Sequence, residues 1–130
     1  MPVRVLVTIT APSAEAADAA IADRVEHCRH VEAEEEGCLQ YEVFHSKLHP
    51  NKTVLCELWA SKAIYDKHWR LQQEREKAAP PKPPAPAPKP GDQQRSVSIE
   101  FYEQRIYQNV DAVWMAADPA ERSETVRWIG

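Results

Sequence analysis

Two short stretches decide how this chain folds: CLQYEVFHS at residues 38–46 and TVLCELWA at residues 53–60. Side chains in both stretches alternate with the period of two that is typical of a β-strand. The residues between them include Pro50 and Asn51, which favour a turn. Two alternating stretches joined by so short a turn predict a β-hairpin.

A predicted helix lies on each side of this hairpin. Residues 14–36 are rich in Ala and Glu, and their apolar residues recur every three or four positions, which is the period of one helical face. Ser13 is in the N-cap position, and Gly37 can end the helix because glycine readily adopts a positive φ. The second helix is predicted at residues 62–77, after the N-cap Ser61 and before a run of prolines.

Two further strands complete the pattern. Residues 3–10 are dense in β-branched side chains, and residues 95–106 alternate again. The order β-α-β-β-α-β is that of the split βαβ motif. The sequence therefore predicts an α+β, ferredoxin-like fold, with a four-stranded antiparallel sheet and both helices on one of its faces.

The rest of the chain forms an insert and a tail. Residues 79–91 are nearly all Pro, Ala and Lys up to Pro90, a composition that favours an extended polyproline conformation. We expect one domain at residues 1–106 that contains this insert, followed by a tail at residues 107–130. One or two short helices are predicted in the tail, because Asp118-Pro119 resembles an N-cap followed by a proline at the first helical position.

Composition excludes several classes of partner. The 130 residues carry a net charge of −4, which gives no electrostatic reason to expect nucleic acid or an anionic membrane. No apolar stretch approaches the roughly 20 residues that a membrane span needs. The three cysteines are odd in number and follow no signal peptide, so we expect free thiols and a cytoplasmic location.

The second face of the predicted sheet also contains apolar side chains. Phe44 and Trp59 are each expected on a strand face opposite their apolar neighbours. An apolar face needs a cover, which a second copy of the chain would supply by packing face to face. The alternative is that the tail folds back over that face.

Three local patterns carry a family resemblance. They are Glu36-Gly37-Cys38 at the start of the hairpin, Glu57-Leu58-Trp59-Ala60-Ser61 at its end, and Asp66-Lys67-His68 in the second helix. Together they resemble the antibiotic biosynthesis monooxygenase family, over roughly residues 3–105. The resemblance implies a dimeric α/β barrel with a pocket between each sheet and its helices. Some members oxidise polycyclic phenols or quinols with molecular oxygen and without metal or flavin, whereas others degrade haem or isomerise small phosphorylated ketones.

His68 is the candidate catalytic residue. At about 100° per residue it lies near the middle of the stripe of the second helix that faces the sheet. There its imidazole would be partly desolvated and could accept a proton from a phenol or enol as a general base. The alternative is a core histidine that is hydrogen-bonded to a strand carbonyl or to a carboxylate such as that of Glu57.

Large side chains around this position are candidates for substrate binding, because a planar substrate would stack on them. Core packing is the better interpretation of each aromatic residue, and Glu57, in the middle of a strand, can instead pair with a lysine or arginine, orient His68 or lie at the wet edge of the sheet. The candidates are Tyr41, Glu57, Trp59, Tyr65, Trp69 and Leu71.

No metal or other cofactor is expected. His27, Cys28, His30 and Glu34 share part of one helix, but no second cluster supplies the remaining ligands, so a solvated helical face is the better interpretation. Haem-degrading members of the family use an asparagine in the first strand, a tryptophan in the second helix and a histidine about three turns later. This chain has no asparagine in its first strand, it has His68 at the position of the tryptophan, and the position of the histidine falls near Ala78. Haem degradation is therefore not expected.

The sequence supports two kinds of function. The first is a cofactor-independent monooxygenase that oxidises a small quinol, phenol or polycyclic aromatic substrate with molecular oxygen, with His68 as the base. The second is a non-catalytic dimeric barrel that binds a partner through the proline-rich insert and the tail. A small-molecule isomerase of the same fold is a further alternative.

Overall fold

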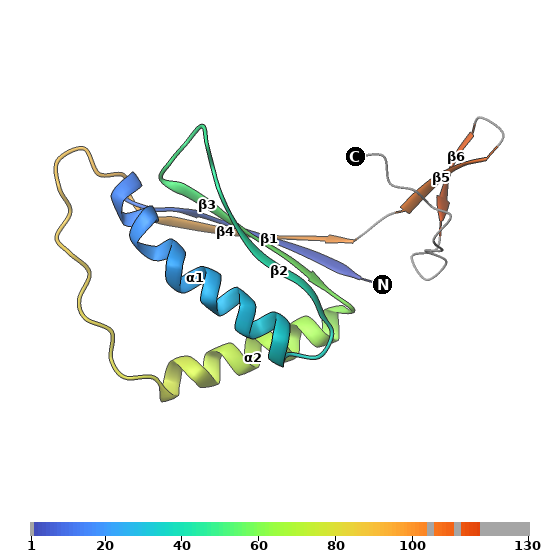
Figure 1. Ribbon diagram of the computed structural model, residues 1–130, viewed down its shortest axis with the longest axis horizontal. Helices are drawn as coiled ribbons and strands as arrows, with labels where there is room; N and C mark the ends of the chain where they lie inside the picture. Colours follow the sequence, from blue (N-terminus) through green and yellow to red (C-terminus); the bar gives the residue numbers. More distant parts are fainter. Residues whose placement is uncertain (1, 104–105, 111–112, 118–130) are drawn as a thin grey trace.

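A computed structural model describes residues 2–103, 106–110 and 113–117. Its main body is one antiparallel sheet with two helices on the same face (Figure 1). In chain order the elements are β1 (Val3–Thr10), α1 (Ala14–Glu34), β2 (Cys38–His45), β3 (Lys52–Trp59), α2 (Lys62–Ala78), β4 (Ser96–Glu103), β5 (Ile106–Val110) and β6 (Val113–Ala117).

The four-stranded sheet has the order β2-β3-β1-β4, and all neighbouring strands are antiparallel. The hairpin therefore lies on one side of the sheet, and β1 is central because it pairs with both β3 and β4. This confirms the predicted ferredoxin-like α+β fold. The fourth strand ends at Glu103, three residues before its predicted end.

Both predicted helix starts are confirmed by their caps. The Oγ atom of Ser13 accepts a hydrogen bond from the amide of Ala16 at 3.1 Å, and that of Ser61 accepts one from the amide of Ile64 at 3.2 Å. Each bond satisfies an amide that has no partner within the first turn of its helix. Helix α1 ends at Glu34 rather than at residue 36, and Gly37 has the expected positive φ, at +87°.

The core lies between the sheet and the two helices. Val5 of β1, Val31 of α1 and Trp59 of β3 have no exposed surface, and Tyr41 and Tyr65 pack against them. Burying a large aromatic or aliphatic side chain stabilises the fold by about 1.5–3 kcal/mol. These contacts hold the C-terminal half of α1 and the first half of α2 to the sheet.

One of the two residues expected on the second face of the sheet is not there. Phe44 does lie on the face opposite the helices and is 51% exposed, but Trp59 points toward the helices and is fully buried. Trp59 follows Glu57 by two positions in β3, so both side chains lie on the same face of the strand, and the indole Nε1 donates a hydrogen bond to the Glu57 carboxylate at 3.0 Å.

We call the face opposite the helices the open face, since no described element covers it (Figure 1). Its apolar side chains are Leu6, Phe44, Val54, Leu58 and Tyr102.

Helices α1 and α2 leave part of their own face of the sheet uncovered. Val97, Ile99 and Phe101 of β4 pair with the core-facing residues of β1, yet they are 42–48% exposed. The helices pack over β2 and β3, which are at the other side of the sheet. In the described chain, β4 is thus an edge strand with an accessible apolar surface.

The tail does not begin as predicted. Residues 106–117 contain β5 and β6, which pair with each other as a separate antiparallel hairpin, where the sequence analysis predicted short helices. β-branched and aromatic residues, including Val110, Val113 and Trp114, favour strands over helices and explain this correction. The predicted cap at Asp118-Pro119 lies outside the described residues. This hairpin projects away from the four-stranded sheet (Figure 1), so it does not cover the open face.

The described part of the chain contains no helix that is long and apolar enough to cross a bilayer.

The turn at Gly37 gives a first testable prediction. A Cβ at this position would lie 2.6 Å from Cδ1 of Ile64, whereas a Cβ at Gly91, which has the same φ of +87°, would meet nothing within 4 Å. Both substitutions by Ala carry the left-handed backbone cost of about 1–2 kcal/mol. We expect Gly37→Ala to lower the free energy of unfolding by about 1–3 kcal/mol more than Gly91→Ala, because only the former forces α2 away from the sheet. Equal losses in urea denaturation would contradict this.

Candidate active site

The imidazole of His68 is 2% exposed and lies between α2 and the sheet. Its Nδ1 atom is 2.8 Å from Oε1 of Glu35, the residue that caps the C-terminal end of α1. A core histidine was predicted to bond to a strand carbonyl or to Glu57, but the partner of His68 in the structure is the carboxylate of Glu35. This pair joins the end of one helix to the middle of the other.

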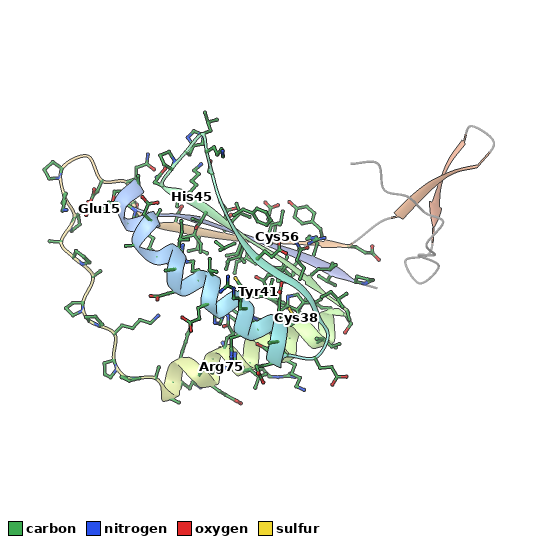
Figure 2. All side chains as sticks on the ribbon, viewed as in Figure 1. Glu15, Cys38, Tyr41, His45, Cys56 and Arg75 are labelled. Carbon is green, nitrogen blue, oxygen red and sulfur yellow. The ribbon has the colours of Figure 1, made fainter. Side chains whose placement is uncertain are left out.

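The Glu35 carboxylate is held from a second direction by α2. Its Oε2 atom lies 3.2 Å from Nη1 of Arg75, which is two helical turns beyond His68. The Glu35 side chain is 7% exposed, whereas that of Arg75 is 41% exposed and reaches the surface. Figure 2 shows Arg75 on α2, close to where the two helices approach each other. His68 and Arg75 together compensate a carboxylate that would be costly to bury alone.

This arrangement fixes the tautomer of His68. A carboxylate only accepts hydrogen bonds, so Nδ1 carries the proton and Nε2 has the free lone pair. No described residue forms a hydrogen bond with Nε2. Burial lowers the pKa of His68, and Glu35 opposes this shift without cancelling it. The imidazole is therefore neutral at pH 7, with Nε2 ready to accept a proton.

Aromatic rings surround the imidazole on the sheet side. The ring centroids of Trp59 and His68 are 4.5 Å apart with the planes tilted by 33°, and Tyr41 and Tyr65 lie at 5.6 and 6.1 Å. Burial raises the pKa of Tyr65 to about 12 and that of Tyr41 further, so both phenols keep their protons. Figure 2 shows Tyr41 on β2, between the sheet and α1.

A cavity of about 230 Å³ borders His68 at the junction of α1, β3 and α2. Trp59, Ile64 and Leu71 supply its apolar wall, and the acidic end of α1 supplies its polar side. The cavity is lined by Glu34, Glu35, Glu36, Trp59, Ile64, Lys67, His68 and Leu71. It brings apolar surface and acidic side chains next to a neutral imidazole, which is the kind of group that acts as a general base.

The structure brings some of the predicted site residues together and separates others. Trp59, His68 and Leu71 line this cavity. Tyr65 is buried and does not line it, and Tyr41 lines a different hollow of about 360 Å³ between α1 and the outer edge of β2. Trp69 is 44% exposed and points away from the core.

Glu57 is a buried carboxylate that does not contact His68. It is 3% exposed, and Trp59 Nε1 is its hydrogen-bond donor among the described residues. Burial raises the pKa of Glu57 to about 7, although the bond from Trp59 opposes the shift. The protonated and ionised forms of this carboxyl are therefore both populated near neutral pH.

Sequence reasoning missed Glu35 and Arg75. Glu35 lies in the Ala- and Glu-rich segment at residues 14–36 and was given no role, because nothing in the sequence connects it with a histidine 33 positions later. Arg75 could have been recognised, since a separation of seven residues places it on the same face of the second helix as His68.

The described residues contain no group of three or more His, Cys, Asp or Glu side chains that could hold a metal ion. The three cysteines are free thiols, as expected. Burial raises the pKa of Cys28 to about 11 and that of Cys38 to about 12, so neither is a reactive thiolate at neutral pH.

Comparison with protein families decides the membership of the chain. The family model described as antibiotic biosynthesis monooxygenase matches residues 2–76, which include β1 to most of α2 and all of the residues that line the cavity. The chain belongs to this family. The resemblance noted from the hairpin and the second helix is thereby confirmed.

Solved structures share the antibiotic biosynthesis monooxygenase fold at low sequence identity. A conserved protein from Methanosarcina mazei has a TM-score of 0.55 at 16% identity, covering 80% of this chain and 93% of that one. A putative antibiotic biosynthesis monooxygenase from Deinococcus radiodurans has a TM-score of 0.53 at 19% identity, and the match covers 83% of this chain and 97% of that one. A putative antibiotic biosynthesis monooxygenase from Caulobacter crescentus has a TM-score of 0.52 at 21% identity, and the match covers 79% of this chain and 89% of that one. At these identities the likeness shows the fold alone. No curated protein sequence matches the chain.

The buried carboxyl of Glu57 predicts a pH dependence of stability. Its pKa is raised from 4.5 to about 7, so the folded state keeps a proton that the unfolded state loses, and stability falls as pH rises from 4.5 to 7. Glu57→Gln removes this loss and keeps an acceptor for Trp59. We expect its stabilising effect to be about 2–3 kcal/mol larger at pH 8 than at pH 5 in urea denaturation. Glu42→Gln, at an exposed position of β2, is the control, and a pH-independent effect at Glu57 would contradict the prediction.

Proposed function

We propose that the chain is a cofactor-independent monooxygenase that oxidises a small phenol or quinol with molecular oxygen, with His68 as the general base. The observation that carries the proposal is the buried His68–Glu35 pair, whose neutral imidazole has no hydrogen-bond partner at Nε2 among the described residues and borders a cavity. Membership of the antibiotic biosynthesis monooxygenase family supports the reaction class.

The base would act at the start of the reaction. Nε2 of His68 takes the proton of the substrate hydroxyl, while Glu35 stabilises the imidazolium through Nδ1. The electron-rich anion passes one electron to oxygen, and the resulting substrate radical and superoxide combine at a ring carbon, ortho or para to the former hydroxyl, that carries one hydrogen. The imidazolium returns its proton to the peroxide, and loss of water, formed from the outer OH group and the hydrogen of that carbon, leaves a second carbonyl. The C–OH and C–H groups and O2 thus give two C=O groups and H2O. The substrate supplies all the electrons.

The cavity limits the size and charge of the substrate. A cavity of about 150 Å³ holds a benzene ring, so a volume of about 230 Å³ fits one or two rings better than three or four. Glu34 and Glu36 make the polar side acidic, with Lys67 as the opposing charge among the lining residues. A neutral or cationic phenol is favoured, and a phosphorylated ketone is disfavoured by repulsion, which argues against the isomerase alternative.

We further propose that the chain forms a homodimer through its open face. Phe44 and Tyr102 are 51% and 45% exposed there, and neither the helices nor the hairpin β5–β6 covers them. A second copy packed face to face would bury the apolar side chains of both sheets and form the barrel that the family resemblance implies.

The central test of the proposed function is oxygen consumption. We expect metal-free protein to consume oxygen with one- and two-ring quinols, and His68→Ala to reduce kcat by about 10²–10⁴-fold, the range of a general base. Glu35→Gln should reduce it less, because the amide still accepts the Nδ1 proton while losing the charge that stabilises the imidazolium.

His30→Gln is the matched control, since this histidine lies on the exposed surface of α1. It should leave turnover unchanged. Turnover that survives His68→Ala in a folded variant would refute the role of His68. Binding of the same quinols without any oxygen consumption would favour the non-catalytic binding module.

The dimer is tested by light scattering at micromolar concentration. The parent chain should have the mass of two copies, and Phe44→Glu should shift it to one copy, because burying two unpaired carboxylates at the interface is unfavourable. Leu48→Glu, at an 82% exposed position of the hairpin turn, should remain dimeric. A monomeric parent chain would contradict the proposed interface.

A further inference from the structure

The proline-rich insert stands clear of the rest of the molecule. All residues from 79 to 91 are exposed, and residues 80–88 form no hydrogen bond or ion pair with any described part of the chain. Figure 1 shows the insert as a long loop that leaves the end of α2, passes outside the domain and returns to β4. Neither the core nor the candidate active site uses it.

Both ends of this loop are fixed. At its start, the amide of Ala79 donates to the carbonyl of Arg75 at 2.9 Å, which closes the last turn of α2. At its end, the amide of Lys89 donates to the Asp92 side chain at 2.8 Å, and the amide of Gln93 donates to the carbonyl of Pro12 at 2.9 Å. The insert is therefore presented between two fixed points, unlike a free terminus.

Its backbone is suited to one regular conformation. Seven prolines lie between residues 80 and 90, and Ala79 begins the insert with φ −71° and ψ 150°, which are polyproline II values. This helix has three residues per turn, so positions three apart lie along one edge. Pro80, Pro83 and Pro86 form one edge, and Pro81 and Pro84 form the adjacent edge. The third edge carries Lys82.

The charge of the insert is opposite to that of the whole chain. Lys77, Lys82 and Lys89 are positive, and no acidic residue lies between positions 77 and 91, although the chain carries a net charge of −4. The two edges that carry prolines can pack into a groove lined by aromatic side chains, and Lys82 on the third edge can pair with carboxylates beside that groove.

We propose that residues 80–86 are a docking motif for a separate protein domain that reads polyproline helices through an acidic, aromatic-lined groove. No residue of the insert lines the candidate active-site cavity. The interaction thus places the chain next to a partner without blocking the cavity. It is independent of whether the cavity is catalytic.

The test titrates the full-length protein into a ¹⁵N-labelled SH3 domain that has an acidic loop beside its aromatic groove. We expect saturable shifts confined to the groove residues of the SH3 domain. Pro80→Ala with Pro83→Ala disrupts one proline edge and should weaken binding by about tenfold or more, because the docked prolines lose their contacts. Pro88→Ala with Pro90→Ala is the matched control on the far side of the motif and should retain the affinity within about twofold.

Charge is tested separately with Lys82→Glu, which should weaken binding at low salt and have a smaller effect at 0.5 M salt. Absence of saturable shifts at millimolar protein would overturn the proposal, as would equal losses in the two double-proline variants. If the parent chain but not Pro80→Ala/Pro83→Ala self-associates beyond the dimer, the motif docks on a second copy instead, and the proposal is wrong about its partner. Circular dichroism of each variant confirms that the domain remains folded.

Discussion

One buried carboxylate, that of Glu35, constrains how the two helices meet. A charge removed from water is tolerated only when it is paired and hydrogen-bonded, and both partners of Glu35 come from α2. Their separation of two helical turns fixes which face of α2 is turned to the end of α1. The turn at Gly37 then has to be tight, because Ile64 of the same helix packs directly against its backbone. The position of the cavity follows from this geometry, since its lining residues come from the segments that the carboxylate brings together.

The same electrostatics determine what the site does to a bound anion. Glu57 accepts a hydrogen bond from Trp59 of the aromatic cluster, Glu35 is paired with His68, and Arg75 is in direct contact with Glu35. Among the residues that line the cavity, Glu34, Glu35 and Glu36 outnumber the single cation Lys67, so the imidazolium formed by proton transfer would be the compensating charge closest to a phenolate. In the proposed reaction, an anion that is poorly stabilised would be a stronger electron donor to oxygen. Stacking against Trp59 would hold the ring without stabilising its charge.

Local signals made most of the fold predictable, and long-range contacts account for what was missed. The alternation of the hairpin strands, the caps at Ser13 and Ser61 and the positive φ at Gly37 depend on neighbouring residues, and the structure has all of them. The cavity position of His68 also follows from helical periodicity. The bond from His68 to Glu35 joins residues 33 positions apart, and no period encodes such a contact. Trp59 was assigned to the wrong face because alternation alone does not show which face the helices cover.

The central position of β1 has a consequence for how the chain folds during synthesis. Val3 pairs with Glu103, so β1, which is synthesised before the other strands of this sheet, acquires its second neighbour only after almost the whole domain has been made. Pairing across such a distance is entropically costly and slows folding. The insert between α2 and β4 reduces part of this cost, because a proline-rich connection has fewer conformations to lose than a flexible one of the same length. A nascent chain stalled before β4 would expose one edge of β1, which makes it a substrate for chaperones or for pairing with another unfinished chain.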